Sequence, residues 1–260
     1  MGRVGYPTEP LSTRAVVKHG VYAVIPPEGR VINVIPGFEG FESTILASPK
    51  LGASFVMIVS EVKPGAKTTT PWGGDGIETF VYFMDGEGEL TVKIGEKKEV
   101  LKQGGYAFCP ADKGLELFNE SGKTFRVILY KQRYIPLKGV AMPAPVFGNI
   151  NDVAEVTYAE MDNVFLKDFL PTNDIAFDFN FHILSFEPGA CHPFIETHVQ
   201  EHGAYVTEGE GIYTLGPDRI HVKKEDFLFM GAFTEQATYA TGRGRFSYVY
   251  SKDFNRDVEL

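Results

Sequence analysis

The chain has 260 residues and a formal net charge of −9, and its 25 Lys and Arg residues are scattered, which argues against a basic surface for nucleic acid or anionic membranes. Apolar residues make up 43%, enough for a sizeable core, and the length suits two ordinary domains. The first residues contain no apolar signal segment, and no apolar run approaches the ~20 residues that cross a bilayer. We therefore expect a soluble cytoplasmic protein.

The N-terminal 50 residues and residues 133–174 flank two similar parts of the chain. The N-terminal segment contains the apolar stretch Val21–Ile25, so we expect these flanking segments to add edge strands or to cross onto the other domain. Within the second segment, residues 153–161 are predicted to form a short helix.

The two similar parts are repeats, offset by roughly 120 residues. Three landmarks recur in the same order: PGA at 64–66 and 188–190, GEG at 86–88 and 209–211, and LKQGGYAFCPA from residue 101 with VKKEDFLFMGA from residue 222. This collinearity predicts two copies of one domain, over roughly 50–135 and 175–255. With their flanking segments, the predicted domains span 1–140 and 141–260.

Each copy has the pattern of short strands. Apolar and polar residues alternate along 89–94 and from Phe177 to Ile183, which is the period of a half-buried strand. Pro-Gly, Gly-Glu-Gly and Gly-Arg-Gly turns separate the runs at short intervals. Aromatic residues, mostly 21 Phe and 12 Tyr, also favour strands. The pattern predicts an all-β protein with two tandem jelly-roll barrels.

Candidate metal ligands gather in the second copy. Glu196, His198 and His202 follow one another at even spacing, so on a strand they would point to one face and converge inside a barrel. Gln236 lies on a downstream element that we expect to pass the same place. Two imidazoles, a carboxylate and an amide oxygen suit Mn²⁺ or Fe²⁺ with open positions, and the lack of a thiolate argues against a closed zinc site.

The remaining histidines and the cysteines have less specific settings. His192 is the alternative ligand, whereas His182 and His221 fit ordinary strand positions. Cys109 and Cys191 lack metal-binding spacing and are interpreted as free thiols, with Cys191 close enough in sequence to line the site.

The spacing in the second copy resembles the two motifs of the cupin superfamily, in which His-x-His, a Glu and a later His hold a metal. Glu196 stands near the first His position, His198 and His202 take the next two, and Gln236 takes the last. The resemblance implies a bicupin, with both domains built as jelly-roll barrels.

The first copy lacks these ligands. The repeat alignment places Gly73, Asp75 and Thr79 opposite the first three candidate ligands, and Leu115 opposite the fourth. We therefore expect an N-terminal barrel that is metal-free and structural.

A closer resemblance extends from Arg14 to Leu260. RAVVKHG, IPGFE, GIETF, GGYAFCP, ETHVQEHGAY and FMGA are similar to the bacterial ureidoglycine aminohydrolases of allantoin degradation in purine catabolism. The resemblance implies one Mn²⁺ per chain, in the C-terminal domain, and hydrolysis of (S)-ureidoglycine to (S)-ureidoglycolate and ammonia.

The resemblance also implies roles for particular residues. The four metal ligands match Glu196, His198, His202 and Gln236, and the substrate-binding pair matches Tyr248 and Lys252. Tyr248, Tyr250 and Lys252 share strand parity, and Lys252 could pair with the substrate carboxylate while Tyr248 orients the substrate. Glu196 and Gln236 would also contact substrate, with Glu196 shuttling protons. Tyr250 is interpreted as barrel packing.

Two other functions remain open at this point. Two histidines and a carboxylate also suit a non-haem iron dioxygenase, and the degenerate first copy fits a non-enzymatic bicupin that binds a small molecule. Paired barrels with a long N-terminal arm suggest a homo-oligomer.

Overall fold

Alternating apolar residues and glycine-rich turns fold most of the chain into short strands. The computed structural model describes residues 13–258. Its elements are β1 (Val16–Lys18), β2 (Tyr22–Ile25), η1 (Pro27–Gly29), β3 (Phe38–Ala47), β4 (Phe55–Thr68), β5 (Ile77–Gly86), β6 (Leu90–Ile94), β7 (Lys97–Leu101), β8 (Gly105–Cys109), β9 (Leu115–Phe118), β10 (Phe125–Arg133), β11 (Val146–Asn149), η2 (Ile150–Asp152), β12 (Val156–Tyr158), β13 (Met161–Asp168), β14 (Phe179–Phe186), β15 (His202–Glu208), β16 (Glu210–Leu215), β17 (Asp218–Lys223), β18 (Phe227–Met230), β19 (Gln236–Ala240) and β20 (Phe246–Asp253).

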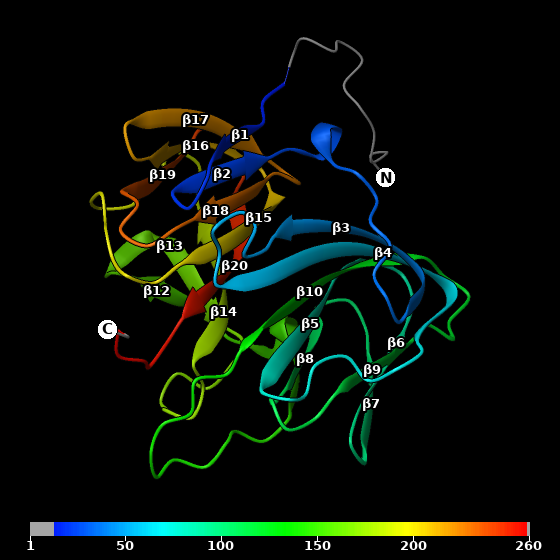
Figure 1. Ribbon diagram of the computed structural model, residues 1–260. Helices are drawn as coiled ribbons and strands as arrows, with labels where there is room; N and C mark the ends of the chain where they lie inside the picture. The colour runs from blue at the N-terminus through cyan, green and yellow to red at the C-terminus, as the bar shows by residue number, and fades with distance from the viewer. Residues whose placement is uncertain (1–12, 259–260) are drawn as a thin grey trace.

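The strands form two barrels that lie side by side (Figure 1). The first barrel is a nine-stranded sheet in the order β11-β8-β5-β10-β4-β9-β6-β7, with β3 paired to β4. The second combines an eight-stranded sheet, β1-β2-β18-β15-β20-β14-β13-β12, with the three-stranded sheet β17-β16-β19. The pairings are antiparallel throughout, as the sequence pattern predicts for jelly rolls.

Strands at both ends of the repeat cross to the other barrel. In the N-terminal arm, Val24 of β2 pairs with Leu228 of β18 in the second barrel. After the first copy, Phe147 of β11 pairs with Ala107 of β8 in the first barrel. The expectation that the flanking segments add edge strands or cross over is therefore confirmed for residues 16–25 and 146–149, and sheet membership does not follow a boundary at residue 140.

The predicted helix over 153–161 is wrong. Residues Val156–Tyr158 form β12, and a two-residue turn at Ala159 and Glu160 returns the chain into β13. Both turn residues have positive φ, 50° and 60°, as a type I′ hairpin requires. The β-branched and aromatic side chains of β12 favour the strand, and its pairing with β13 provides backbone partners that a short isolated helix would lack. The described helices are two 3-10 segments of three residues each, and none could cross a membrane.

Three apolar cores follow from the alternation of side chains across the strands. Interior residues of the first barrel include Val81, Phe83 and Leu115, all fully buried. A second cluster fills the space between the barrels, where the rings of Phe80 and Phe181 stack with centroids 4.4 Å apart. The third cluster lines the second barrel and surrounds a cavity.

Candidate metal centre and substrate cavity

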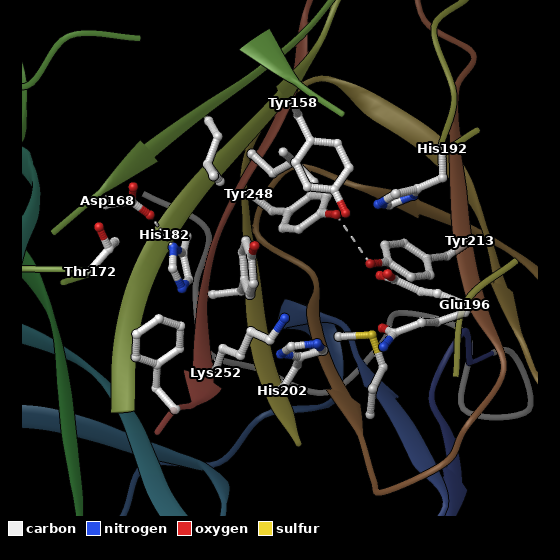
Figure 2. Close-up of a pocket in the computed structure, with 16 residues that line it drawn as sticks. Tyr158, Asp168, Thr172, His182, His192, Glu196, His202, Tyr213, Tyr248 and Lys252 are labelled. Atoms are coloured by element: carbon white, nitrogen blue, oxygen red, sulfur yellow. Dashed lines mark hydrogen bonds and ion pairs between the residues drawn. The ribbon is translucent and has the colours of Figure 1, made fainter. Parts of the chain in front are cut away.

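The second barrel encloses a cavity of about 390 Å³ (Figure 2). Even-numbered side chains of β14, β15 and β20 point into it, because successive residues of a strand alternate between its two faces. The cavity is lined by Tyr158, Leu166, Asp168, Thr172, His182, Leu184, His192, Glu196, His202, Tyr213, Met230, Gln236, Tyr248, Tyr250, Lys252 and Phe254. Tyr248, Tyr250 and Lys252 thus share one face, as their parity predicts.

Two histidines converge beside this cavity. The Nε2 atoms of His198 and His202 are 3.3 Å apart. The Nδ1 atom of each ring lies near a backbone carbonyl, that of Gln200 at 3.0 Å for His198 and that of Ser251 at 2.9 Å for His202. Each Nδ1 therefore donates its hydrogen to a carbonyl, and each Nε2 presents a lone pair toward the other.

The surroundings keep both rings neutral. Burial is the main cause that lowers the pKa of His198, and it lowers the pKa of His202 well below the ordinary value. The ammonium of Lys252 acts on both pKa values in the same direction. Two facing lone pairs without a proton between them repel, so this arrangement is suited to a cation.

Gln236 lies beside the two histidines, and Glu196 is its partner across an isolated bridge. The two residues form an isolated bridge, with reciprocal backbone hydrogen bonds of 3.0 Å, and the Gln236 amide lies 3.0 Å from Nε2 of His198. The Glu196 carboxylate points toward the Tyr213 hydroxyl (Figure 2). In the described part of the chain, no three His, Cys, Asp or Glu side chains lie close enough to hold a metal ion together.

The prediction that Glu196, His198 and His202 lie on one strand is wrong. Glu196 lies in an isolated bridge, His198 lies in a loop, and His202 is the first residue of β15. Between Glu196 and His202 the chain runs as a loop, in which the His198 carbonyl accepts a hydrogen bond of 2.8 Å from the amide of Phe233. His198 and His202 nevertheless meet.

Several cavity residues were missed or assigned only to packing. His182 lies on β14 as expected, but its ring lines the cavity and its Nδ1 lies 2.6 Å from Asp168 Oδ1. Tyr213 donates a hydrogen bond of 3.2 Å to the Tyr248 hydroxyl, and burial raises the pKa of both phenols. The parity of strand residues could have indicated these inward positions, but their partners come from other strands.

His192, the alternative ligand, is placed apart from His202 (Figure 2). Its Nδ1 accepts a hydrogen bond of 2.9 Å from the Thr238 amide. His221 lies on strand β17, as predicted, where it is exposed and pairs with Glu210. The two cysteines are free, with Cys109 buried and Cys191 half-buried.

The first barrel repeats the framework of the site without its ligands. Trp72 and Leu115 form the isolated bridge that corresponds to that of Glu196 and Gln236. Trp72, and not Gly73, therefore occupies the position of Glu196, a one-residue error caused by a loop that differs in length. Thr79 pairs with Cys109 as His202 pairs with Met230, so Thr79 is correctly placed opposite the second histidine.

Known proteins resemble the chain along nearly its whole length, although no protein-family model matches it. The chain is 48% identical to (S)-ureidoglycine aminohydrolase of Escherichia coli over 257 residues, which cover 98% of the chain and 97% of that enzyme. The chain belongs to the (S)-ureidoglycine aminohydrolase family. The family member of that name from Arabidopsis thaliana is 29% identical over 245 residues, covering 94% of the chain and 79% of the plant protein.

Solved structures share the two-barrel fold of this family member. The crystal structure of the Escherichia coli protein Ylba matches with a TM-score of 0.85 and 46% identity, covering 96% of the chain and 98% of Ylba. Oxalate decarboxylase of Bacillus subtilis matches with a TM-score of 0.69 and 10% identity, covering 100% of the chain and 81% of the decarboxylase, a likeness of fold alone. The predicted fold of two tandem cupin barrels is confirmed.

Proposed function

We propose that the chain hydrolyses (S)-ureidoglycine to (S)-ureidoglycolate and ammonia in the cavity of the second barrel. The observation that carries the proposal is the pair of neutral imidazoles, His198 and His202, whose Nε2 atoms lie 3.3 Å apart beside the cavity of the second barrel. The near full-length similarity to the Escherichia coli enzyme supports this substrate and reaction.

The donor set fits one Mn²⁺ ion held by Glu196, His198, His202 and Gln236. The two histidines present fixed lone pairs, and a half-turn of the Gln236 amide presents its oxygen where the nitrogen now lies. Glu196 joins the set when its carboxylate turns from Tyr213. When bound, the metal supplies Lewis-acid polarisation of water or substrate, and the hard oxygen ligands favour Mn²⁺ over softer alternatives.

Protein groups around the metal position orient the substrate. The Lys252 ammonium lies beside His202 in the cavity and suits the substrate carboxylate (Figure 2). The Tyr248 hydroxyl is held by Tyr213 and fixes the substrate by hydrogen bonding. Glu196 and Gln236 contact the reacting carbon's substituents, and Glu196 moves the proton between water and the leaving amine.

The test is ammonia release from ureidoglycine, which is generated in situ from allantoate because it decays in solution. Chelator-treated protein should release ammonia at the uncatalysed rate, and Mn²⁺ should restore release and give one enantiomer of ureidoglycolate. Release that stays uncatalysed while Mn²⁺ is bound would overturn the proposed substrate. Oxygen consumption during turnover would instead favour a dioxygenase.

The homo-oligomeric state and the cytoplasmic location stay predictions.

A further inference from the structure

His192 is a rigid polar side chain in the cavity that the metal site and its substrate-binding pair do not use. The residue is 8% exposed, and its backbone amide donates to the Thr238 carbonyl at 3.0 Å. The rings of Phe186 and Tyr158 pack edge-on against the imidazole, with centroids 5.1 Å and 6.0 Å away. The ring therefore has one orientation, which directs it into the cavity (Figure 2).

The hydrogen-bond partner of His192 fixes which nitrogen carries the hydrogen. Nδ1 accepts from the Thr238 amide at 2.9 Å, so Nδ1 has no hydrogen and the neutral ring carries it on Nε2. Burial lowers the pKa of His192 to about 4, which keeps the ring neutral at physiological pH. Nε2–H has no hydrogen-bond acceptor among the described residues. The cavity therefore contains a neutral donor without a protein partner.

The position of the Nε2–H donor in the cavity indicates which group of a ligand it would bind. In Figure 2 His192 and Lys252 lie on opposite sides of the cavity, with Glu196 and Tyr213 between them. The charged end at Lys252 suits a carboxylate, whereas a neutral N–H at the other end suits an uncharged carbonyl oxygen. The ureido group is the part of ureidoglycine that offers such an oxygen.

We infer that His192 Nε2–H donates a hydrogen bond to the ureido carbonyl oxygen of the substrate and so determines specificity for ureido compounds. This inference rests on the proposed function. A carboxylate that lacks the ureido group would offer this cavity donor no acceptor, so such compounds bind less well.

Two variants separate the two nitrogens of His192. Asn can place an oxygen where Nδ1 stands, so His192→Asn keeps the acceptor for Thr238 and removes the cavity donor. Gln reaches further, so His192→Gln keeps a donor near Nε2 and loses the acceptor. His221→Asn is the matched control, because His221 is exposed on β17 and pairs only with Glu210. His192→Met, with neither donor nor acceptor, replaces the Asn variant if that variant does not fold.

The probes are N-carbamoylglycine, a stable ureido carboxylate without the amine, and acetate, which lacks the ureido group. For the Mn²⁺-loaded protein, His192→Asn should raise the dissociation constant of N-carbamoylglycine about tenfold and leave that of acetate unchanged. His192→Gln should retain most of the affinity for N-carbamoylglycine, and KM for ureidoglycine should follow the same order with equal metal content.

Three outcomes would overturn the inference: no binding of N-carbamoylglycine to the wild type, unchanged affinity in His192→Asn, or an equal loss for both probes, which would indicate a structural role. A wild type that binds N-carbamoylglycine but releases no ammonia from ureidoglycine would refute the proposed function. In that case, the dissociation constants of N-carbamoylglycine for the wild type and the His192 variants would still decide whether His192 binds the ureido group.

Discussion

The two barrels share one framework but differ in what fills it. In the first, the Trp72–Leu115 bridge closes over an interior of Val, Leu and Phe side chains. In the second, the corresponding bridge of Glu196 and Gln236 borders a cavity lined by ionisable and aromatic side chains. The same backbone therefore supports either a packed core or a reactive site, and a few inward positions decide between them.

In the second barrel, hydrogen bonds on the side away from the reactive atoms fix the orientation of the histidine rings. The imidazoles of His198 and His202 are each anchored through Nδ1, and the ring of His182 is anchored by Asp168. Such anchoring leaves a reactive atom facing the cavity while most buried hydrogen-bonding groups stay satisfied. The first barrel and the aromatic core between the barrels bury apolar side chains, and this burial stabilises the fold that contains the site.

Of the changes that test the contrast between the barrels, Glu196→Ala should have the largest effect, a loss of ammonia release. Removing the carboxylate that we assign to proton transfer should lower ammonia release at least ~1000-fold, even where metal remains bound. Steady-state kinetics with metal analysis of the purified variant check this result.

Glu235→Ala is the control for this variant, because Glu235 is the exposed neighbour of Gln236 and its side chain lies outside the cavity. It should retain wild-type turnover. Ammonia release by Glu196→Ala at the wild-type rate would contradict the proton-transfer role.

Leu115 and Gln236 are equivalent positions, and giving each the other's side chain should affect different properties: stability in the first barrel and Mn²⁺ affinity in the second. Leu115→Gln buries an amide in an apolar interior and should cost about 3 kcal/mol, or a fall in Tm of roughly 6–12 °C. Gln236→Leu should leave the Tm of the metal-free protein nearly unchanged but weaken Mn²⁺ binding. Calorimetry of both metal-free variants and a Mn²⁺ titration check the two arms. Similar Tm changes in both variants would refute the distinction between the interiors.

Glu78 should give the smallest effect, because it is an unpartnered carboxyl between the barrels. It is fully buried, neither oxygen has a hydrogen-bond partner among the described residues, and burial next to Asp178 raises its pKa far above the ordinary value. Since the folded pKa exceeds the unfolded one, the wild type loses stability as pH rises above about 4.3. Glu78→Gln removes this loss.

The expected Tm gain of Glu78→Gln is at least about 3 °C at pH 8, because each unit by which the folded pKa exceeds the unfolded one is worth about 1.4 kcal/mol, and the gain is close to zero at pH 4. Thermal unfolding between these pH values measures the gain. Glu89→Gln, an exposed carboxyl paired with Lys102, should show no such trend. A gain that does not change with pH would refute the explanation.

The repeat and the strand parity predict much of this architecture. Alternation places Tyr248 and Lys252 on one face, and the repeat locates Leu115 opposite Gln236. Both patterns are local or periodic, so the sequence contains them directly. The helix over 153–161 fails because a two-residue turn and pairing with β13 outweigh local preference.

Other features depend on partners that are distant in the sequence. His182 fits an ordinary strand position until β13 brings Asp168 beside it, and the tautomer of His192 depends on an amide of β19. The direction of Glu196 toward Tyr213 is likewise a choice of side-chain rotamer that no spacing indicates. Sequence patterns can name such residues but not orient them.

The strand exchange between the barrels has a consequence for synthesis on the ribosome. Val24 leaves the ribosome early but must wait for Leu228, roughly two hundred residues later, before β2 can pair. The first barrel, which needs little beyond Phe147, can close long before then. A cut between the repeats that falls before β11 would leave each fragment without a strand of its barrel, so each half of the chain is needed to complete the sheet of the other.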